Sequence, residues 1–117
     1  YPVTMNGPEL CAAIQKAKVD LGFAVKMDHE TRPLHVDRES FLVTSLQKVY
    51  ADYTVDSSGP IVSGGGTYAR AFDNAVAFGG AFPGEANTCH QTDEFWSIDS
   101  MSKNFDIIVK ALAVLAQ

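Results

Sequence analysis

The strongest pattern in the chain is the helical spacing of apolar side chains. In residues 7–22 these side chains recur every three or four positions, and Gly22 suits the C-terminal cap. Residues 37–53 show the same spacing behind Asp37, a residue type that often caps helix N-termini. The patterns predict two helices, of which the first ends at Gly22 and the second begins after Asp37.

A third helix is expected to begin near Ser97 or Asp99. Its apolar positions recur at three- and four-residue intervals along one stripe: Met101, Phe105, Ile108, Leu112 and Leu115. The helix is also apolar around much of its circumference, which is typical of a helix that is packed between other elements. This chain offers few elements that could cover it.

Between the helices, short apolar runs have the length of β-strands. They are residues 1–3, 23–29, 61–63 and 74–80. Strands mixed with helices, some of them ending in glycine loops, predict an α/β fold. The chain begins within one of these runs, which suggests a piece of a longer protein.

Composition and charge narrow the classes of function. With 117 residues, 46% of them hydrophobic and 20% charged, the chain has the character of one globular domain or part of one. Its net charge of -5 argues against a nucleic-acid partner. No apolar run reaches the roughly 18 residues of a membrane span, so no membrane partner is expected. Cys11 and Cys89 match neither a CxxC motif nor a disulfide scaffold, which favours reduced thiols in a cytoplasmic protein.

The run SGGGTYAR, residues 63–70, has the ingredients of an anion site. The backbone at Gly65 and Gly66 can approach a ligand closely, because glycine has no Cβ. Thr67 adds a hydroxyl, and Arg70 adds a guanidinium that can pair with a carboxylate or phosphate. The spacing matches neither a P-loop nor a dinucleotide fingerprint. A tight turn that carries no ligand is the alternative.

His90 lies in a loop rich in small and polar residues, beside Cys89. Such a histidine can be a metal ligand, a general base or a surface residue. Catalytic zinc needs three protein ligands, and no HExxH motif or histidine at ligand spacing accompanies His90. Glu94 is a candidate for orienting a metal-bound imidazole, and a solvated loop charge is the alternative. The residues alone give at most one isolated ligand.

Residues 64–99 read GGGTYARAFDNAVAFGGAFPGEANTCHQTDEFWSID. This stretch closely resembles the C-terminal segment of the PepV-like dipeptidases, the Xaa-His or carnosinase-type enzymes of the zinc-dependent M20 class of peptidases. The glycine run, the Asn-x-Val-Ala-Phe-Gly strand, the Phe-Pro-Gly-Glu loop and a His-Gln-x-x-Glu before the final helix occur in the same order. The resemblance extends, more weakly, to the start of the chain.

The resemblance implies a fold and an activity. The family has an α/β catalytic domain with an inserted ferredoxin-like lid. Residues 1–34 would then be the end of the lid, and residues 35–117 the last part of the catalytic domain. The implied activity is hydrolysis of short peptides with a free amino terminus, by water that two metal ions activate.

The same resemblance implies site residues. His90 matches a terminal ligand to one of the two metal ions, which are usually zinc, with manganese or cobalt as substitutes. The C-terminal carboxylate of the dipeptide would fall to Gly65, Gly66 and Thr67, while Arg70 matches a motif arginine. The other ligands and the glutamate base of the family have no counterpart in this chain, so the chain alone is expected to be inactive.

The expected partners are a dipeptide substrate and the missing N-terminal part of the enzyme, with a second copy of the chain as a further candidate. Two other functions stay open. The chain could be a non-catalytic binding or assembly module, or part of an aminoacylase- or deacetylase-type enzyme of the same class. The GGGTYAR run favours the dipeptidase branch.

Overall fold

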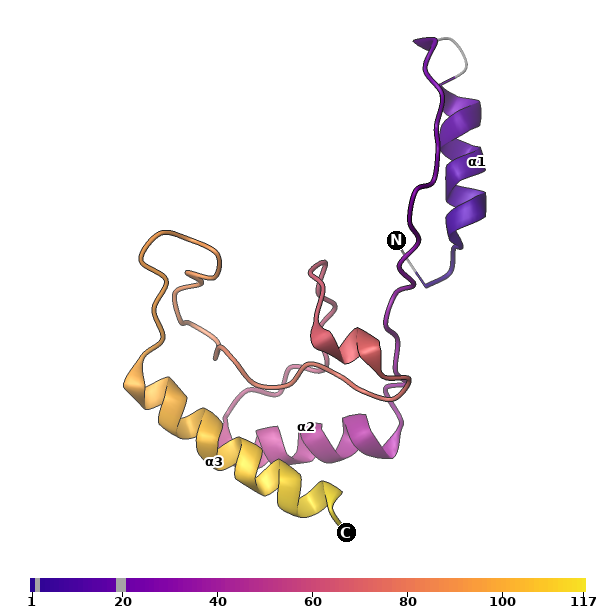
Figure 1. The fold of residues 1–117 in the computed structure, drawn as a ribbon. Helices are drawn as coiled ribbons and strands as arrows, with labels where there is room; N and C mark the ends of the chain where they lie inside the picture. The colour runs from indigo at the N-terminus through magenta and orange to yellow at the C-terminus, as the bar shows by residue number, and fades with distance from the viewer. Residues whose placement is uncertain (2, 19–20) are drawn as a thin grey trace.

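The residues that the structure describes form three α-helices joined by long irregular segments (Figure 1). A computed structural model describes residues 1, 3–18 and 21–117. Its elements are α1 (Gly7–Ala17), α2 (Phe41–Tyr53), the 3₁₀ turn η2 (Tyr68–Ala71) and α3 (Ile98–Leu115). None of the helices in these residues is both long and apolar enough to cross a membrane.

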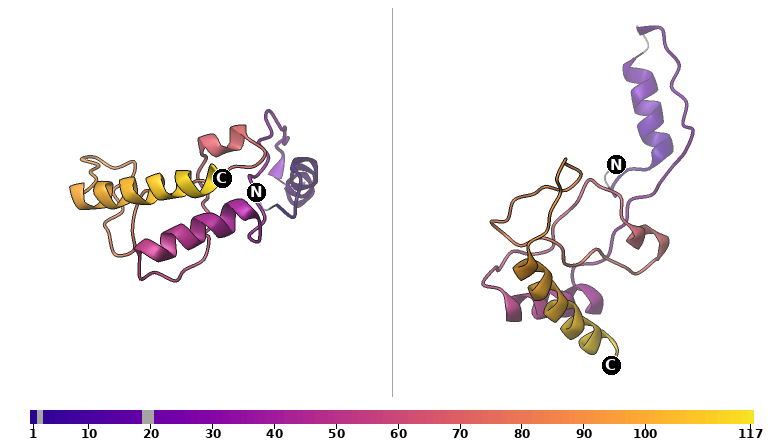
Figure 2. Two further views of the ribbon diagram at one scale, coloured as in Figure 1. Left: turned by 90° about the horizontal axis from the view of Figure 1, so that it is seen from below. Right: turned by 60° about the vertical axis from the view of Figure 1, so that its left-hand side comes forward.

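The molecule is extended. Its radius of gyration is 18.8 Å, with extents of 55 × 37 × 24 Å. A compact domain of this length has a radius of gyration of about 13 Å. The solvent-accessible surface is 9474 Å², against roughly 6,200 Å² for a compact protein of this mass. Helix α1 stands away from the pair formed by α2 and α3 in every view (Figures 1 and 2).

Helix α1 starts as its sequence predicts but ends earlier. The side chain of Asn6 accepts a hydrogen bond from the backbone N–H of Glu9 at 2.9 Å, which caps the helix start. The helix ends at Ala17, and the C-cap is Lys18, whose N–H bonds to the carbonyl of Ile14. The predicted cap at Gly22 is therefore wrong, because the helix already ends at Ala17.

Residues 21–30 run back along α1 (Figure 1). Gln15 accepts a hydrogen bond from the N–H of Val25 at 3.0 Å. Glu30 accepts one from the N–H of Gly7 at 2.9 Å and one from the hydroxyl of Tyr1 at 2.7 Å. Side-chain hydrogen bonds therefore attach this segment to α1. In a β-sheet, hydrogen bonds between two backbones would do so.

Helix α2 is capped by Ser40, and the prediction of Asp37 as the cap is wrong. The hydroxyl of Ser40 accepts a hydrogen bond from the N–H of Val43 at 3.3 Å. Asp37 lies one turn earlier, where its carboxylate accepts a hydrogen bond from the N–H of Glu39 at 2.9 Å. Asp37 stabilises the turn that leads into the helix, a role to which its short side chain is equally suited.

The core lies between α2 and α3. Its buried residues are Leu46 and Val49 of α2 and Ile107 and Ala111 of α3. Partly buried side chains pack around them: Leu42, Tyr50, Val76, Phe78, Phe82, Val114 and Leu115. This small cluster is the only hydrophobic core among the described residues.

Helix α3 begins at Ile98 behind the N-cap Ser97, which confirms the predicted start. Most of its predicted apolar stripe is exposed. Phe105 is 69% exposed and Leu112 is 64% exposed. The buried face instead comprises Ser100, Asn104, Ile107 and Ala111. An apolar face of α3 is thus open to solvent, although Leu115 at the end of the stripe packs against the core.

The predicted α/β fold is contradicted, because the part of the chain that the structure describes is helical and contains no β-strand. Of the first predicted strand, residues 1–3, the central residue lies outside the described part. Residues 23–29, 61–63 and 74–80 form no backbone ladder, which a strand requires. Val62 is 99% exposed, although its run reads as a buried strand. The division into residues 1–34 and 35–117 stays a prediction.

Candidate functional site

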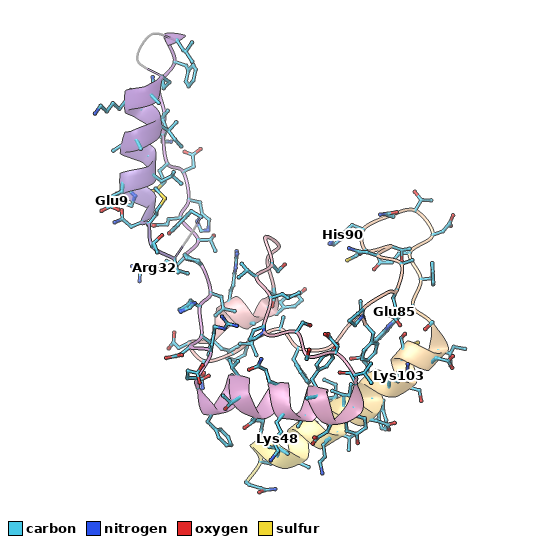
Figure 3. The ribbon with its side chains drawn as sticks, turned by 180° about the vertical axis from the view of Figure 1, so that it is seen from behind. Glu9, Arg32, Lys48, Glu85, His90 and Lys103 are labelled. Atoms are coloured by element: carbon cyan, nitrogen blue, oxygen red, sulfur yellow. The ribbon has the colours of Figure 1, made fainter. Side chains whose placement is uncertain are left out.

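His90 lies on a loop, residues 81–97, that projects away from the start of α3 (Figure 3). The loop closes on itself where the hydroxyl of Thr88 bonds to both the carbonyl and the N–H of Phe95, at 3.2 and 3.3 Å. Within it, His90 and Asp93 have φ angles of 62° and 61°. This left-handed backbone costs about 1–2 kcal/mol per residue. His90 is exposed, so its imidazole can reach a ligand outside the loop.

Glu94 contacts the backbone at His90. Its carboxylate accepts a hydrogen bond from the N–H of His90 at 3.3 Å. No hydrogen bond to the imidazole occurs within the described residues. Glu94 thus supports the strained loop, and its expected role toward the ring stays a prediction.

Glu85 connects the base of the same loop to α3. One carboxylate oxygen accepts a hydrogen bond from the N–H of Phe82 at 2.9 Å, and the other accepts from the hydroxyl of Ser100. Ser100 is 2% exposed and lies in the first turn of α3. A carboxylate is favourable there, because the N-terminus of a helix carries partial positive charge.

Asn104 forms a second connection that the sequence did not reveal. Its carboxamide donates to the carbonyl of Gly80 at 2.7 Å and accepts from the N–H of Gly80 at 3.1 Å. Gly79 and Gly80 have φ angles of 88° and 103°, a conformation that favours glycine. The paired glycines followed by an irregular loop were the available signal for such a contact.

The predicted carboxylate site forms one exposed turn. Thr67 caps η2, because its hydroxyl accepts a hydrogen bond from the N–H of Ala69 at 2.9 Å. A Cβ placed on Gly66 would lie 3.7 Å from a terminal nitrogen of Arg70, so the guanidinium lies beside the glycine run. The N–H of Gly65 bonds to the hydroxyl of Ser63 at 3.2 Å. The structure therefore brings together all four predicted residues, although binding by them stays a prediction.

The glycine turn and the loop that carries His90 are separate projections (Figure 1). No hydrogen bond or ion pair joins them in the described part of the chain. Nor do those residues include a group of three His, Cys, Asp or Glu side chains that could hold a metal ion. The described residues therefore hold no complete metal site by themselves, and the role of His90 as a ligand stays a prediction.

A groove of about 790 Å³ lies between α2, α3 and the extended segments around residues 58–63 and 76–83. Its wall is mainly apolar. At one end the hydroxyl of Tyr50 donates to Asp56 at 2.9 Å. The hydroxyl and N–H of Ser58, with Tyr50, hold the pKa of Asp56 below its ordinary value. Burial, followed by the bond to Asp56, raises the pKa of Tyr50.

Comparison with known proteins identifies relatives along the whole chain. YtjP of Bacillus subtilis, named a putative dipeptidase, is 34% identical over 117 residues, which are 100% of this chain and 25% of that protein. Proteins with the same designation from Staphylococcus haemolyticus and Staphylococcus saprophyticus are 31% and 36% identical, over 96% and 81% of this chain and 24% and 20% of their own lengths.

The chain is therefore homologous to proteins designated as dipeptidases, and it spans a quarter or less of the length of these relatives. No family model matches the chain. No solved structure matches it either.

Proposed function

We propose that this chain is part of a metal-dependent dipeptidase of the PepV-like M20 type, which hydrolyses short peptides that have a free amino terminus. The observation that carries the proposal is the homology to designated dipeptidases along the entire chain. The order of the glycine run and the His-Gln-x-x-Glu loop supports the finer assignment within that group.

In this proposal His90 ligates one of two metal ions, with zinc as the first choice and manganese or cobalt as substitutes. Its exposure at the end of an anchored loop supports the role, because a terminal ligand must reach beyond its own element. The other ligands and the general base belong to the part of the enzyme outside this chain. Bound metal ions would supply Lewis acidity toward the scissile carbonyl and toward water.

The glycine turn would receive the C-terminal carboxylate of the dipeptide. Arg70 offers a guanidinium that suits the two oxygens of a carboxylate, and it lies beside Gly66. Thr67 holds the turn through its bond to Ala69. Gly65 and Gly66 allow close approach of a bound anion to the backbone. The chain thus contributes two separate corners of the proposed site.

The remainder of the enzyme would cover the open apolar face of α3. That face includes Met101 at 48%, Phe105 at 69% and Leu112 at 64% exposure. Large contiguous apolar surface of this kind marks a protein–protein contact. The extended shape of the chain also supports a partner that fills the space between its arms.

The test uses the product of the complete reading frame that encodes this chain. His90→Ala should remove one metal equivalent and reduce turnover of Ala-Ala at least about 100-fold. His29→Ala is the matched control, because His29 is also exposed but belongs to the segment beside α1. Elemental analysis and a dipeptidase assay measure both effects. Full metal content and turnover in His90→Ala would overturn the assignment.

A second assay separates the two enzyme classes. The full product should cleave Ala-Ala and leave N-acetylalanine intact, because a dipeptidase requires a free amino terminus. The 117-residue chain alone should cleave neither compound. Cleavage of N-acetylalanine alone would replace the dipeptidase proposal with the deacetylase alternative.

A further inference from the structure

The buried face of α3 is divided into a polar half and an apolar half. Ser100 and Asn104 lie one turn apart and are 2% and 5% exposed. Ile107 and Ala111 continue the same face, at 2% and 4% exposure, and pack against α2. Buried polar side chains are costly unless they are hydrogen-bonded. Asn104 bonds to Gly80, directly before the loop of His90, and Ser100 bonds to Glu85 within that loop.

Asn104 is matched to the backbone of Gly80. Its carboxamide uses one donor and its acceptor on the same residue, as a neighbouring peptide group in a sheet would. The approach is close on the other side too, since a Cβ on Gly79 would lie 2.6 Å from the oxygen of the Asn104 carboxamide. The contact therefore depends on glycine at position 79.

Ser100 provides the second attachment, through Glu85. The carboxylate of Glu85 joins the Ser100 hydroxyl to the N–H of Phe82. Figure 3 shows Glu85 between α3 and the outer part of the loop, where His90 lies. Two side chains on one face of α3 thus fix the base of the loop, and the outer part extends beyond them.

We propose that Asn104 is a positioning residue that fixes the loop of residues 81–97, and with it His90, on α3. Glu85 and Ser100 form the second attachment of the same loop. The inference rests on the geometry of these residues and holds whether or not His90 binds a metal ion. A residue with only a general structural role would instead affect the α2–α3 pair as a whole.

The test is amide hydrogen exchange, measured by NMR on the ¹⁵N-labelled 117-residue chain. Asn104→Ala should speed exchange of the Gly80 amide at least about tenfold, because that N–H loses its acceptor. The His90 amide signal should shift in the same variant. Ala111→Gly is the matched control: it weakens α3 at a buried position but leaves the contact between Asn104 and Gly80 in place.

The inference predicts that Asn104→Ala and Ala111→Gly change different sets of amide exchange rates. Ala111→Gly should speed exchange in α2 and α3 without a selective effect at Gly80 or a shift at His90. Identical patterns in the two variants, or an unchanged Gly80 amide in Asn104→Ala, would overturn the inference. Ser100→Ala, which keeps a good helix former, tests the second attachment if Asn104→Ala does not fold. It should speed exchange at Phe82 and shift the His90 signal, and no change at either would equally overturn the inference.

Discussion

The ring of Phe82 lies parallel to the ring of Tyr50, with centroids 6.4 Å apart and an angle of 7° between the planes. The ammonium group of Lys103 lies 5.7 Å from the centroid of the same Phe82 ring. Phe82 belongs to the start of the loop that carries His90, whereas its two neighbours belong to α2 and α3. One aromatic side chain therefore connects the loop to both helices of the core.

The aromatic character of Phe82 should be measurable as stability. Phe82→Leu keeps an apolar side chain but loses the stacked pair and the cation–π contact, so the free energy of unfolding should fall by about 1 kcal/mol. Urea denaturation followed by circular dichroism measures the change. Phe72→Leu is the control, because Phe72 is 65% exposed. Equal losses in the two variants would contradict a specific role for the ring of Phe82.

Acid should weaken the contact between Tyr50 and Asp56. The pKa of Asp56 is lowered in the folded chain, first by the hydroxyl of Ser58, then by the N–H of Ser58 and by Tyr50. A lowered folded-state pKa means that this stabilisation is complete above the ordinary aspartate pKa of about 4 and is lost as pH falls through the folded-state value.

The measurement compares unfolding free energies of the chain and of Asp56→Asn between pH 7 and pH 2. The difference between the two should be largest at neutral pH and should shrink below about pH 4. Asp52→Asn, which changes an exposed aspartate of α2, should track the unchanged chain. A difference between the chain and Asp56→Asn that is constant with pH would show that the charge of Asp56 contributes nothing.

The two adjacent glycines before the loop should respond differently to alanine. Both have positive φ angles, 88° at Gly79 and 103° at Gly80, so each substitution introduces backbone strain. Only at Gly79 does the new Cβ meet the carboxamide of Asn104, at 2.6 Å, while nothing lies within 4 Å of a Cβ at Gly80. Gly79→Ala should therefore displace the Asn104 side chain, whereas Gly80→Ala should leave it in place.

The side-chain NH₂ signals of Asn104 report this difference directly. They should move to solvent-exposed shifts in Gly79→Ala and stay near their original positions in Gly80→Ala. Displacement of both sets of signals would mean that backbone strain, and not the collision, controls the contact.

Local signals in the sequence predicted the helices. The buried faces and the strands could not be predicted in this way, because they depend on contacts between residues that are distant in the sequence. The start of α3 follows from a serine cap and apolar spacing, both of which act within a few residues. Which face of α3 is buried depends on what packs against it. The apolar spacing identified a stripe that includes Phe105 and Leu112 but did not show which face is buried, and the structure buries Asn104 and Ile107. The predicted strands failed for the same reason, because a strand needs a partner that its own sequence does not specify.

In the candidate site, too, the sequence indicated the residues whose side-chain type carries the chemistry, but not the residues that support them. His90 and Arg70 were found by their side-chain types, because an imidazole suits a metal ion and a guanidinium suits a carboxylate. The supporting residues were missed, since Asn104 and Ser100 are polar, as are Lys103 and Asp106 on the same helix, and read as solvent-facing positions. Their roles depend on Gly80 and Glu85, which approach them only in the folded chain.

The open face of α3 leads to a prediction that separates folding from association. In the 117-residue chain, Phe105→Gln should change the free energy of unfolding by less than about 0.5 kcal/mol, because Phe105 is 69% exposed. Ile107→Ala, at a position that is 2% exposed, should lower it by about 2–5 kcal/mol. Urea denaturation of both variants checks this contrast.

In the product of the complete reading frame, Phe105→Gln should cost more stability than it does in the 117-residue chain. If the rest of the protein covers this face, Phe105 becomes buried, and Phe105→Gln should then destabilise the protein by about 2 kcal/mol or more, because a large apolar side chain loses its packing. A loss below about 0.5 kcal/mol in both contexts would show that the face stays open to solvent. The comparison tests the proposed partner of α3 without reference to metal binding or catalysis, since Phe105 is part of neither the loop of His90 nor the glycine turn.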